Sequence, residues 1–245
     1  NNELYVELQP QYDATKSVIS SEVLLRWKHP HMGTVSPSEF IPIAEENDFI
    51  AELGLWVCNE ACRLLSECQS NKINTKLSVN ISAKHLARAD FVSKFVAIVN
   101  KWRVSHKNLT LELTEGALIR GVSVIQRRVR ELAEQGFSLS IDDFGLGDSN
   151  LNYLQDLPIT ELKVDRVFVE AMEGSQQKTL LVTSICNMAK ALHINTVAEG
   201  IETTGQLDQA KACGCGAFQG YYLDKPMSVD DWKSKISEKQ YKEGS

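Results

Sequence analysis

The sequence predicts an α/β fold, a TIM-like (β/α)8 barrel, from two observations. Short runs rich in β-branched and aromatic residues alternate with longer helical patterns along all 245 residues, an order typical of parallel βα units with right-handed crossovers. About eight such units fit a chain of this length as one domain. An open doubly wound sheet is the alternative, but no glycine-rich phosphate loop follows the first strand, which favours the barrel.

Eight segments have the composition of strands, and helical patterns separate them. For example, Val122, Ile125, Val129 and Leu132 recur at helical spacing, and Gly136 ends that helix. The expected strands span residues 5–8, 18–25, 77–81, 109–113, 138–141, 161–164, 195–198 and 217–219. Further helices are expected over residues 37–46, from there through about residue 69, around residues 180–192, and after the capping residue Ser228.

Charge and composition exclude several classes of function. The formal net charge of −6 argues against binding of nucleic-acid polymers, which requires a basic surface. No apolar run approaches the ~20 residues of a membrane span, and no secretory leader opens the sequence. The six cysteines form no CxxC pair, so we expect reduced thiols and a cytoplasmic location.

The boundaries of the chain predict an excised domain. The sequence begins abruptly in a strand-like segment, so we expect regulatory or other domains in a longer protein, of which this chain is a cytoplasmic part, with or without a membrane anchor elsewhere. The domain is expected to span residues 1–232. The charged residues 233–245 are expected to form a frayed tail.

Polar residues stand at the ends of the expected strands. In a barrel the C-terminal strand ends converge on one mouth, and a charge beside an apolar run is costly unless it is paired or bound to a metal. A single glutamate there is ordinarily solvated, but five carboxylates brought together would repel one another without cations. The polar residues, in chain order, are Glu22, Asn80, Glu112, Asp142, Asp143, Lys163, Glu199 and Gln219.

The types of these residues indicate hard metal ions. Carboxylate and amide oxygens suit Mg²⁺ or Mn²⁺. The adjacent Asp142 and Asp143 can serve two neighbouring ions, and two ions about 3.5–4 Å apart form the usual clamp for phosphodiester hydrolysis. The pattern therefore indicates a two-metal site.

Eight short motifs resemble those of the EAL domain family and follow in the same order. Residues 22–27, EVLLRW, are similar to the family signature EALLRW. A lone Asp-Phe-Gly would be weak, whereas ordered matches across nearly the whole chain are specific. The other motifs are HP at 29–30 with VSP at 35–37 and EFIP at 39–42, VNISA at 79–83, ELTE at 112–115, DDFG at 142–145, KVD at 163–165, AEGIE at 198–202 and QGY at 219–221.

The resemblance implies a barrel with one strand running against the others, and two-metal hydrolysis of cyclic di-GMP to linear 5′-pGpG with Mg²⁺ or Mn²⁺. We expect Ca²⁺ to inhibit, because it is larger and prefers looser geometry. The family also implies a homodimer. By motif position, the metal ligands are Glu22, Asn80, Glu112, Asp142 and Asp143, with Glu199 as a further ligand. The catalytic set is Glu22, Lys163 at the attacking water, Glu199 and the loop-organising Glu115, while Gln9, Arg26 and Gln219 contact the substrate.

Structural roles are the alternatives for three of these residues. Lys163 could form a salt bridge with Asp165, and Arg26 could pair with Glu22. Asn80 could cap the end of its strand through a hydrogen bond.

The sequence departs from the family pattern in the signature and in one loop. Val23 replaces an alanine, a small apolar change. In the loop that usually reads DFGTGYSSL, Leu146 replaces a threonine-like residue and Asp148 an aromatic one. The family ties this loop to metal binding and dimer contact, so the departure bears on activity and its regulation.

Two other functions compete with hydrolysis of cyclic di-GMP. A degenerate domain of this family would bind cyclic di-GMP as a receptor, but such domains lose metal ligands, and this chain keeps them. Another Mg²⁺ barrel enzyme, such as an enolase-like lyase, would need a positioned base and a lid domain. The Asp142-Asp143 pair has no purpose in that enzyme.

Overall fold

The computed structural model describes residues 3–120, 123–145 and 152–243. Its sheet has the strand order β1-β9-β8-β7-β6-β5-β4-β2-β3, and an additional pairing between β1 and β2 closes it into a barrel. The strands are β1 Leu4–Tyr12, β2 Val18–His29, β3 Gly33–Val35, β4 Leu77–Asn80, β5 Leu109–Thr114, β6 Ser138–Phe144, β7 Glu161–Val164, β8 Asn195–Ala198 and β9 Ala217–Phe218. The predicted (β/α)8 barrel is therefore confirmed.

One strand of the barrel runs against the others, as the resemblance implied. Strand β1 pairs antiparallel with both β2 and β9. The remaining neighbours around the barrel, from β2 through β4 to β9, pair in parallel. The C-terminal ends of these parallel strands therefore lie at one mouth.

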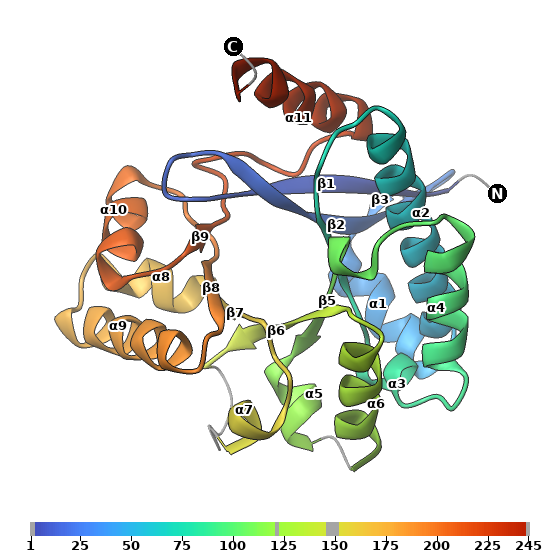
Figure 1. Ribbon diagram of the computed structural model, residues 1–245, viewed down its shortest axis with the longest axis horizontal. Helices are drawn as coiled ribbons and strands as arrows, with labels where there is room; N and C mark the ends of the chain where they lie inside the picture. Colours follow the sequence, from blue (N-terminus) through green and yellow to red (C-terminus); the bar gives the residue numbers. More distant parts are fainter. Residues whose placement is uncertain (1–2, 121–122, 146–151, 244–245) are drawn as a thin grey trace.

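Helices surround the barrel. Figure 1 shows α2, α4 and α6 on one side and α8, α9 and α10 on the other. The helices are α1 Pro37–Glu46, α2 Ile50–Ser70, α3 Ala83–Leu86, α4 Phe91–Lys101, the 3₁₀ turn η1 His106–Asn108, α5 Glu115–Arg120, α6 Ser123–Glu134, α7 Asn152–Asp156, α8 Arg166–Met172, α9 Gln176–Ala191, α10 Thr204–Cys213 and α11 Val229–Glu243. Within the described ranges, no helix is long and apolar enough to span a membrane.

Some elements were missed or shortened by the sequence prediction. Strand β2 continues to His29 and forms a hairpin with the three-residue strand β3. Such a short strand gives no readable alternation. Helix α4 was also missed, although Phe91, Phe95 and Val99 recur every fourth residue and are buried.

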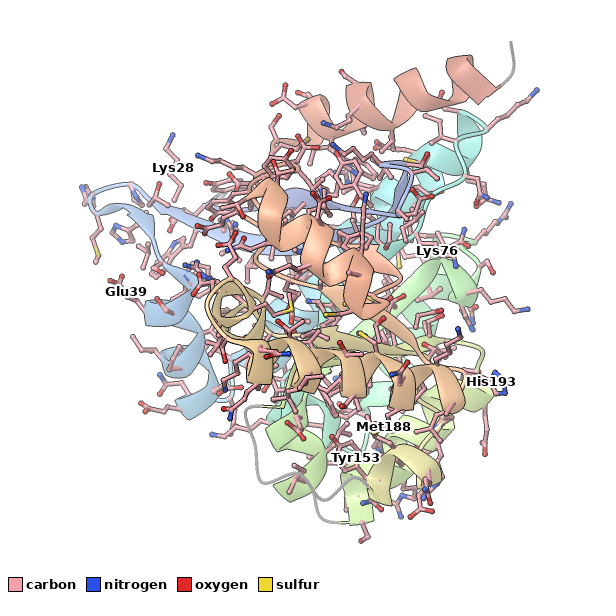
Figure 2. All side chains as sticks on the ribbon, turned by 90° about the vertical axis from the view of Figure 1, so that its left-hand side faces the viewer. Lys28, Glu39, Lys76, Tyr153, Met188 and His193 are labelled. Carbon is pink, nitrogen blue, oxygen red and sulfur yellow. The ribbon has the colours of Figure 1, made fainter. Side chains whose placement is uncertain are left out.

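Alternation along the strands separates a polar interior from an apolar outer layer. Leu109, Leu111 and Leu113 of β5 are buried in one core with residues of the surrounding helices, such as Phe95, whereas Glu112 between them has the opposite orientation. Exposed polar side chains such as Lys28 and His193 lie at the periphery (Figure 2). The core thus fixes the strands, and the alternate residues are free to form a site.

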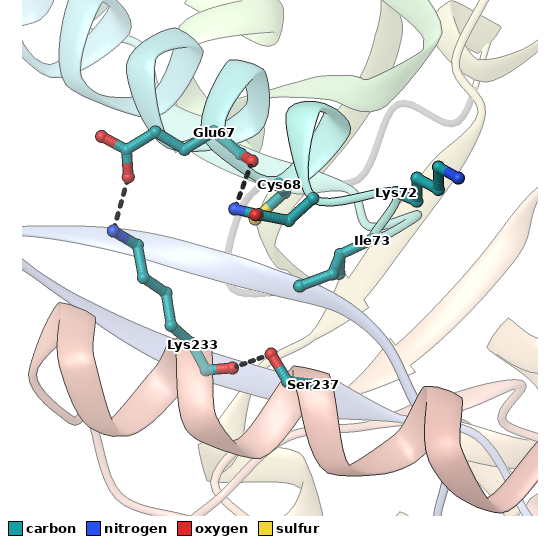
Figure 3. Close-up of a pocket in the computed structure, with 7 residues that line it drawn as sticks. Glu67, Cys68, Lys72, Ile73, Lys233 and Ser237 are labelled. Atoms are coloured by element: carbon teal, nitrogen blue, oxygen red, sulfur yellow. Dashed lines mark hydrogen bonds and ion pairs between the residues drawn. The ribbon is translucent and has the colours of Figure 1, made fainter.

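Helix α11 continues well past residue 232, where the domain was expected to end. Trp232 is fully buried and donates from Nε1 to Ser21 Oγ of β2 at 2.9 Å. Lys233 pairs with Glu67 of α2 at 2.5 Å beside a cavity of about 510 Å³ (Figure 3). In the part of the chain that the structure describes, α11 spans Val229–Glu243.

Candidate active site

The ammonium of Lys163 on β7 lies among four carboxylates at the mouth of the barrel. Nζ is 2.8 Å from Glu199 Oε1 and 2.9 Å from Glu112 Oε2. It is 3.4 Å from both Glu22 Oε2 and Asp142 Oδ1. Only 1% of the Lys163 side chain is exposed. Four of these residues lie within strands β2, β5, β6 and β7, and Glu199 directly follows β8, so the structure brings together the polar residues that the sequence analysis grouped.

The cluster carries more negative than positive charge. Burial, followed by repulsion from Glu22, raises the pKa of Glu112 well above its usual value. Burial likewise raises the pKa of Glu199 to about 8. The carboxylates outweigh the effect of burial on Lys163 and raise its pKa, led by Glu112. A single ammonium therefore leaves part of the carboxylate charge uncompensated.

Glu22 differs from its neighbours because several donors surround it. Burial alone would raise its pKa, but Lys163 and hydrogen bonds from Gln219 and Asn80 lower it. Asn80 Nδ2 donates to Glu22 Oε1 at 2.8 Å, and Gln219 Nε2 donates to Oε2 at 2.7 Å. Glu22 is therefore held ionised, as a metal ligand must be.

The residues present fit divalent cations. Glu112 Oε1 is buried without a hydrogen bond of standard geometry, although Ser78 is near enough to lower the pKa of this carboxyl. In the part of the chain that the structure describes, no three potential ligands are close enough to hold an ion as they stand, since the Lys163 ammonium lies between the carboxylates. Excess carboxylates with a free buried oxygen suit hard ions.

Strand β6 ends in a distorted segment that carries Asp142 and Asp143. The pairing with β7 shifts register between Ile141 and Phe144, and Asp143 has a φ of 55°. Left-handed backbone is uncommon for non-glycine residues and concentrates at functional sites. Asp143 N donates to Asp142 Oδ1 at 3.0 Å. Burial and the Asp142 charge raise the pKa of Asp143.

Glu115 bonds to Gly145, directly after β6, and to Tyr153 of α7. Its side chain is buried at the start of α5 and accepts from Gly145 N at 2.9 Å and from Tyr153 OH at 3.0 Å. The two bonds connect the start of α5 to the end of β6 and to α7. Leu146 and Asp148, the departures from the family pattern, lie outside the described residues.

The three expected substrate-binding residues lie on β1, on β2 and directly after β9. Gln9 and Gln219 are buried and share a hydrogen bond of 3.1 Å from Gln219 Nε2 to Gln9 Oε1. Arg26 Nε donates to Glu7 Oε2 at 2.8 Å, so its partner is Glu7 rather than Glu22. Their contact with substrate stays a prediction.

The alternative role of Lys163, a salt bridge with Asp165, does not match its surroundings. Asp165 caps helix α8 by accepting from Val167 N at 2.7 Å. The hydrogen bonds of Lys163 go to Glu112 and Glu22. Lys163 is therefore positioned by the site itself.

Two cavities are lined in part by β2, which contributes Glu22 to the first and Arg26 to the second. The first, of about 240 Å³, is lined by Gln9, Glu22, Arg166, Glu199, Gly200, Glu202, Gln219, Gly220 and Tyr221. The second, of about 320 Å³, includes Arg26, Pro37, Ile41, Glu45, Asn80, Ser82 and Thr114.

Sequence reasoning missed Arg166, Glu202 and Tyr221 as residues of the mouth. Each directly follows, or closes, a motif that was identified, namely KVD, AEGIE and QGY. Because loops after parallel strands converge at the same mouth, their position next to a strand end was the available signal.

Known proteins resemble this chain over most of its length. The "Oxygen sensor protein DosP" of Escherichia coli (strain K12) is 36% identical over 241 residues, which cover 96% of this chain and 30% of DosP. The "Cyclic di-GMP phosphodiesterase PA2567" of Pseudomonas aeruginosa is 36% identical over 228 residues, which cover 91% of this chain and 39% of that protein. The chain thus spans well under half of these relatives.

Solved structures share the fold closely. The PaMucR phosphodiesterase in complex with c-di-GMP has a TM-score of 0.90 and 33% identity, covering 94% of either chain. The EAL enzyme Bd1971, with cAMP and cyclic di-GMP bound, has a TM-score of 0.91 and 32% identity, covering 96% of this chain and 65% of Bd1971. The family model of the EAL domain matches residues 1–226. With this match across the barrel and its mouth, the chain belongs to the EAL domain family.

Proposed function

We propose that this domain hydrolyses cyclic di-GMP to linear 5′-pGpG. The observation that carries the proposal is the buried Lys163 ammonium among four carboxylates at the barrel mouth. A relative named as a cyclic di-GMP phosphodiesterase and a solved relative complexed with c-di-GMP support the choice of substrate. Water adds across one P–O3′ bond, so that its oxygen joins phosphorus and its proton ends on the leaving 3′ oxygen.

Two Mg²⁺ or Mn²⁺ ions complete this site in the proposal. When bound, such ions lower the pKa of a water and neutralise charge on the phosphoryl oxygens. The Oε1 of Glu112, buried without a hydrogen bond of standard geometry, and the carboxylate excess support their binding. The residues that would hold them are Glu22, Asn80, Glu112, Asp142 and Asp143, with Glu199 as a further ligand.

The other residues of the site bind and orient. Lys163 holds the attacking water with its ammonium, a fixed positive charge that burial keeps close to the reacting phosphate. Gln9 and Gln219 present amide groups to the substrate. Arg26 can grip a phosphate through its planar guanidinium, in exchange for Glu7. Glu115 keeps the loop after β6 in place through Gly145.

The shape of the mouth suits a two-base ligand. One cavity lies on the β1 and β9 side of Glu22, and the other lies between β2, α1 and β4. An elongated cyclic dinucleotide can place its scissile phosphate at the carboxylates and one base on either side. This arrangement supports a cyclic dinucleotide over a mononucleotide.

Partners and location are part of the same proposal. Because the relatives are much longer than this chain, further domains would regulate it. A homodimer is expected from the family, with the loop after β6 in contact with its copy. A cytoplasmic location fits a substrate that is a bacterial second messenger.

A receptor that binds cyclic di-GMP without cleaving it is the second candidate. The test is to incubate the domain with cyclic di-GMP and Mg²⁺ and to separate the products by ion-exchange chromatography. We expect pGpG, its loss with EDTA, its return with Mg²⁺ or Mn²⁺, and inhibition by Ca²⁺. Binding without product identifies the receptor, and undiminished cleavage in excess EDTA rejects the metal mechanism.

A matched pair of variants locates the chemistry. Glu112→Gln removes the charge of a buried carboxylate that contacts Lys163, so we expect product formation to fall by at least about 10²-fold. Glu131→Gln makes the same chemical change on α6, where Glu131 pairs with Arg128 at 2.5 Å. This control should cleave at the parent rate. Equal losses of product formation in both variants would show that cleavage does not take place at the barrel mouth.

A further inference from the structure

The segment after Gly220 returns to the first strand of the barrel. Asp224 N donates to Gly220 O at 3.0 Å, and Met227 exchanges two backbone hydrogen bonds with Leu8 of β1 at 2.9 and 3.0 Å. A Cβ on Gly220 would lie 2.2 Å from backbone atoms of Ile201, so this turn requires glycine. The turn places Asp224 directly beside β1, at the edge of the substrate mouth.

The carboxylate of Asp224 is held from two sides. It accepts a hydrogen bond from Tyr12 OH of β1, and it pairs with Lys235 Nζ of α11 at 2.5 Å. Tyr12 is buried, and burial together with this bond raises the pKa of its hydroxyl, which therefore stays a donor. Hydrogen bonds to a charged group are shorter and stronger than neutral ones, so the two contacts fix the position of Asp224.

The backbone of Asp224 transmits this position to the site. Its carbonyl accepts from Gln9 Nε2 at 3.0 Å. That bond fixes which end of the Gln9 amide faces Gln219, whose Nε2 donates to Gln9 Oε1 at 3.1 Å. The same Nε2 donates to Glu22 Oε2 at 2.7 Å. One continuous set of contacts thus runs from the C-terminal helix to the central glutamate of the site.

We propose that Asp224, held by Tyr12 and Lys235, is a positioning residue for substrate binding. It orients the amides of Gln9 and Gln219 before substrate binds. Without it, these side chains would lose their rotamer freedom on binding, at a cost in affinity. The proposal rests on the proposed function, because it assigns these amides to cyclic di-GMP. It also makes helix α11, whose Lys235 forms the pair, a functional part of the domain.

The proposal predicts a change in KM rather than in kcat. Asp224→Ala removes the contacts with Tyr12 and Lys235 and so loosens the backbone carbonyl that holds the Gln9 amide. A weakening equivalent to one ordered hydrogen bond corresponds to about a fivefold rise in KM. The bond made to substrate is the same in the ground and transition states, so kcat should stay within about twofold. Asp224→Asn keeps an acceptor for Tyr12 and should restore most of the affinity. Tyr12→Phe gives the same test from β1 if Asp224→Ala does not fold.

Two lysines of α11 provide a matched comparison. Lys235→Met removes the pair with Asp224 and should raise KM about twofold, as expected for a partly exposed pair. Lys233→Met, on the same helix, removes the pair with Glu67 of α2 (Figure 3). Its KM should equal that of the parent. A merely structural role of α11 predicts equal effects of the two substitutions.

A substrate-free measurement separates this proposal from the proposed function. The side-chain amide protons of Gln9, assigned with Gln9→Leu, should exchange with solvent faster in Asp224→Ala than in the parent. Faster exchange together with raised KM supports the proposal. Unchanged exchange in folded Asp224→Ala or Tyr12→Phe overturns it. A parent that cleaves no cyclic di-GMP rejects the proposed function, whereas the exchange rates still decide the positioning.

Discussion

Replacing Lys163 by methionine tests the site most directly. Methionine keeps a long apolar stem but removes the ammonium, so four carboxylates lose the cation that they share. Removing one partner of a buried ion pair costs about 3–5 kcal/mol, because the remaining charge is left uncompensated. For a domain of this size, that cost lowers Tm by roughly 6–20 °C.

The loss of stability in Lys163→Met should depend on pH and on bound metal ions. Without the ammonium, protonation of Glu112 and Glu199 is the remaining way to reduce the repulsion, and burial already raises both pKa values. A carboxyl whose folded pKa is raised contributes stability below its unfolded pKa and loses it as pH rises through the folded value. The Tm deficit of Lys163→Met should therefore be larger at pH 9 than at pH 6. Added Mg²⁺ should reduce it, since the ions replace the lost charge.

Turnover should fall more than binding. An interaction made with the attacking water acts mostly in the transition state, so Lys163→Met should lower kcat by roughly 10²–10³. Cyclic di-GMP should still bind in the presence of Ca²⁺. The assays are thermal melts in EDTA and in Mg²⁺, calorimetric binding with Ca²⁺, and single-turnover cleavage on one preparation. Lys190→Met, an exposed lysine of α9, is the control.

Two results would refute this reasoning. A Lys163→Met protein that melts early yet cleaves at the parent rate would remove Lys163 from the mechanism and leave it a structural role. A protein that melts with the parent in EDTA would show that the carboxylates do not need this cation.

Three further predictions concern other parts of the chain. Leu146→Thr combined with Asp148→Tyr should raise cleavage or Mg²⁺ affinity, and parent values in both measurements would make the departure neutral. Burial lowers the pKa of His85 to about 4, so stability should fall as pH decreases from about 6.5 through 4, by at most about 3 kcal/mol. Melts of His85→Asn should show less of this slope, unlike those of exposed His193→Asn. Gly220→Ala should cost about 1–3 kcal/mol through the clash with Ile201, and an unchanged Tm would contradict the tightness of this turn.

The barrel and its polar mouth could be predicted because both depend on patterns along single segments. In Leu111, Glu112 and Leu113 a charged residue stands between two apolar ones. This alternation indicates a strand with one apolar face and one polar face. The antiparallel direction of β1 came only from the family resemblance, because no local pattern encodes the direction of a strand. The residues that surround Lys163 were predicted as a group, since each lies in or directly after a strand of the same barrel.

Pairwise contacts could not be predicted, because they depend on register and on distant segments. Glu7 opposes Leu24, so Arg26 is its diagonal neighbour on the same face of the β1–β2 ribbon. Without the register, Glu22 was the plausible partner for Arg26, being the carboxylate nearest in sequence. The structure shows that Glu22 is already occupied by amide donors, Asn80 and Gln219. Arg26 therefore pairs with Glu7, which lies two residues along β1 from Gln9, the residue opposite Glu22.

A helix was expected after Ser228, but the extent of helix α11 could not be predicted, for a related reason. Its apolar stripe is short, with buried Trp232 and Ile236 among charged residues, and such a composition is typical of a solvated tail. The stripe suffices because the Trp232 indole also donates to Ser21, the residue before Glu22. A hydrogen bond to a strand that carries a central site residue is invisible in the helix sequence alone. Helix α11 therefore contacts β2 through Trp232 and contacts Asp224 through Lys235. These two contacts explain why a segment with the composition of a tail packs against the barrel.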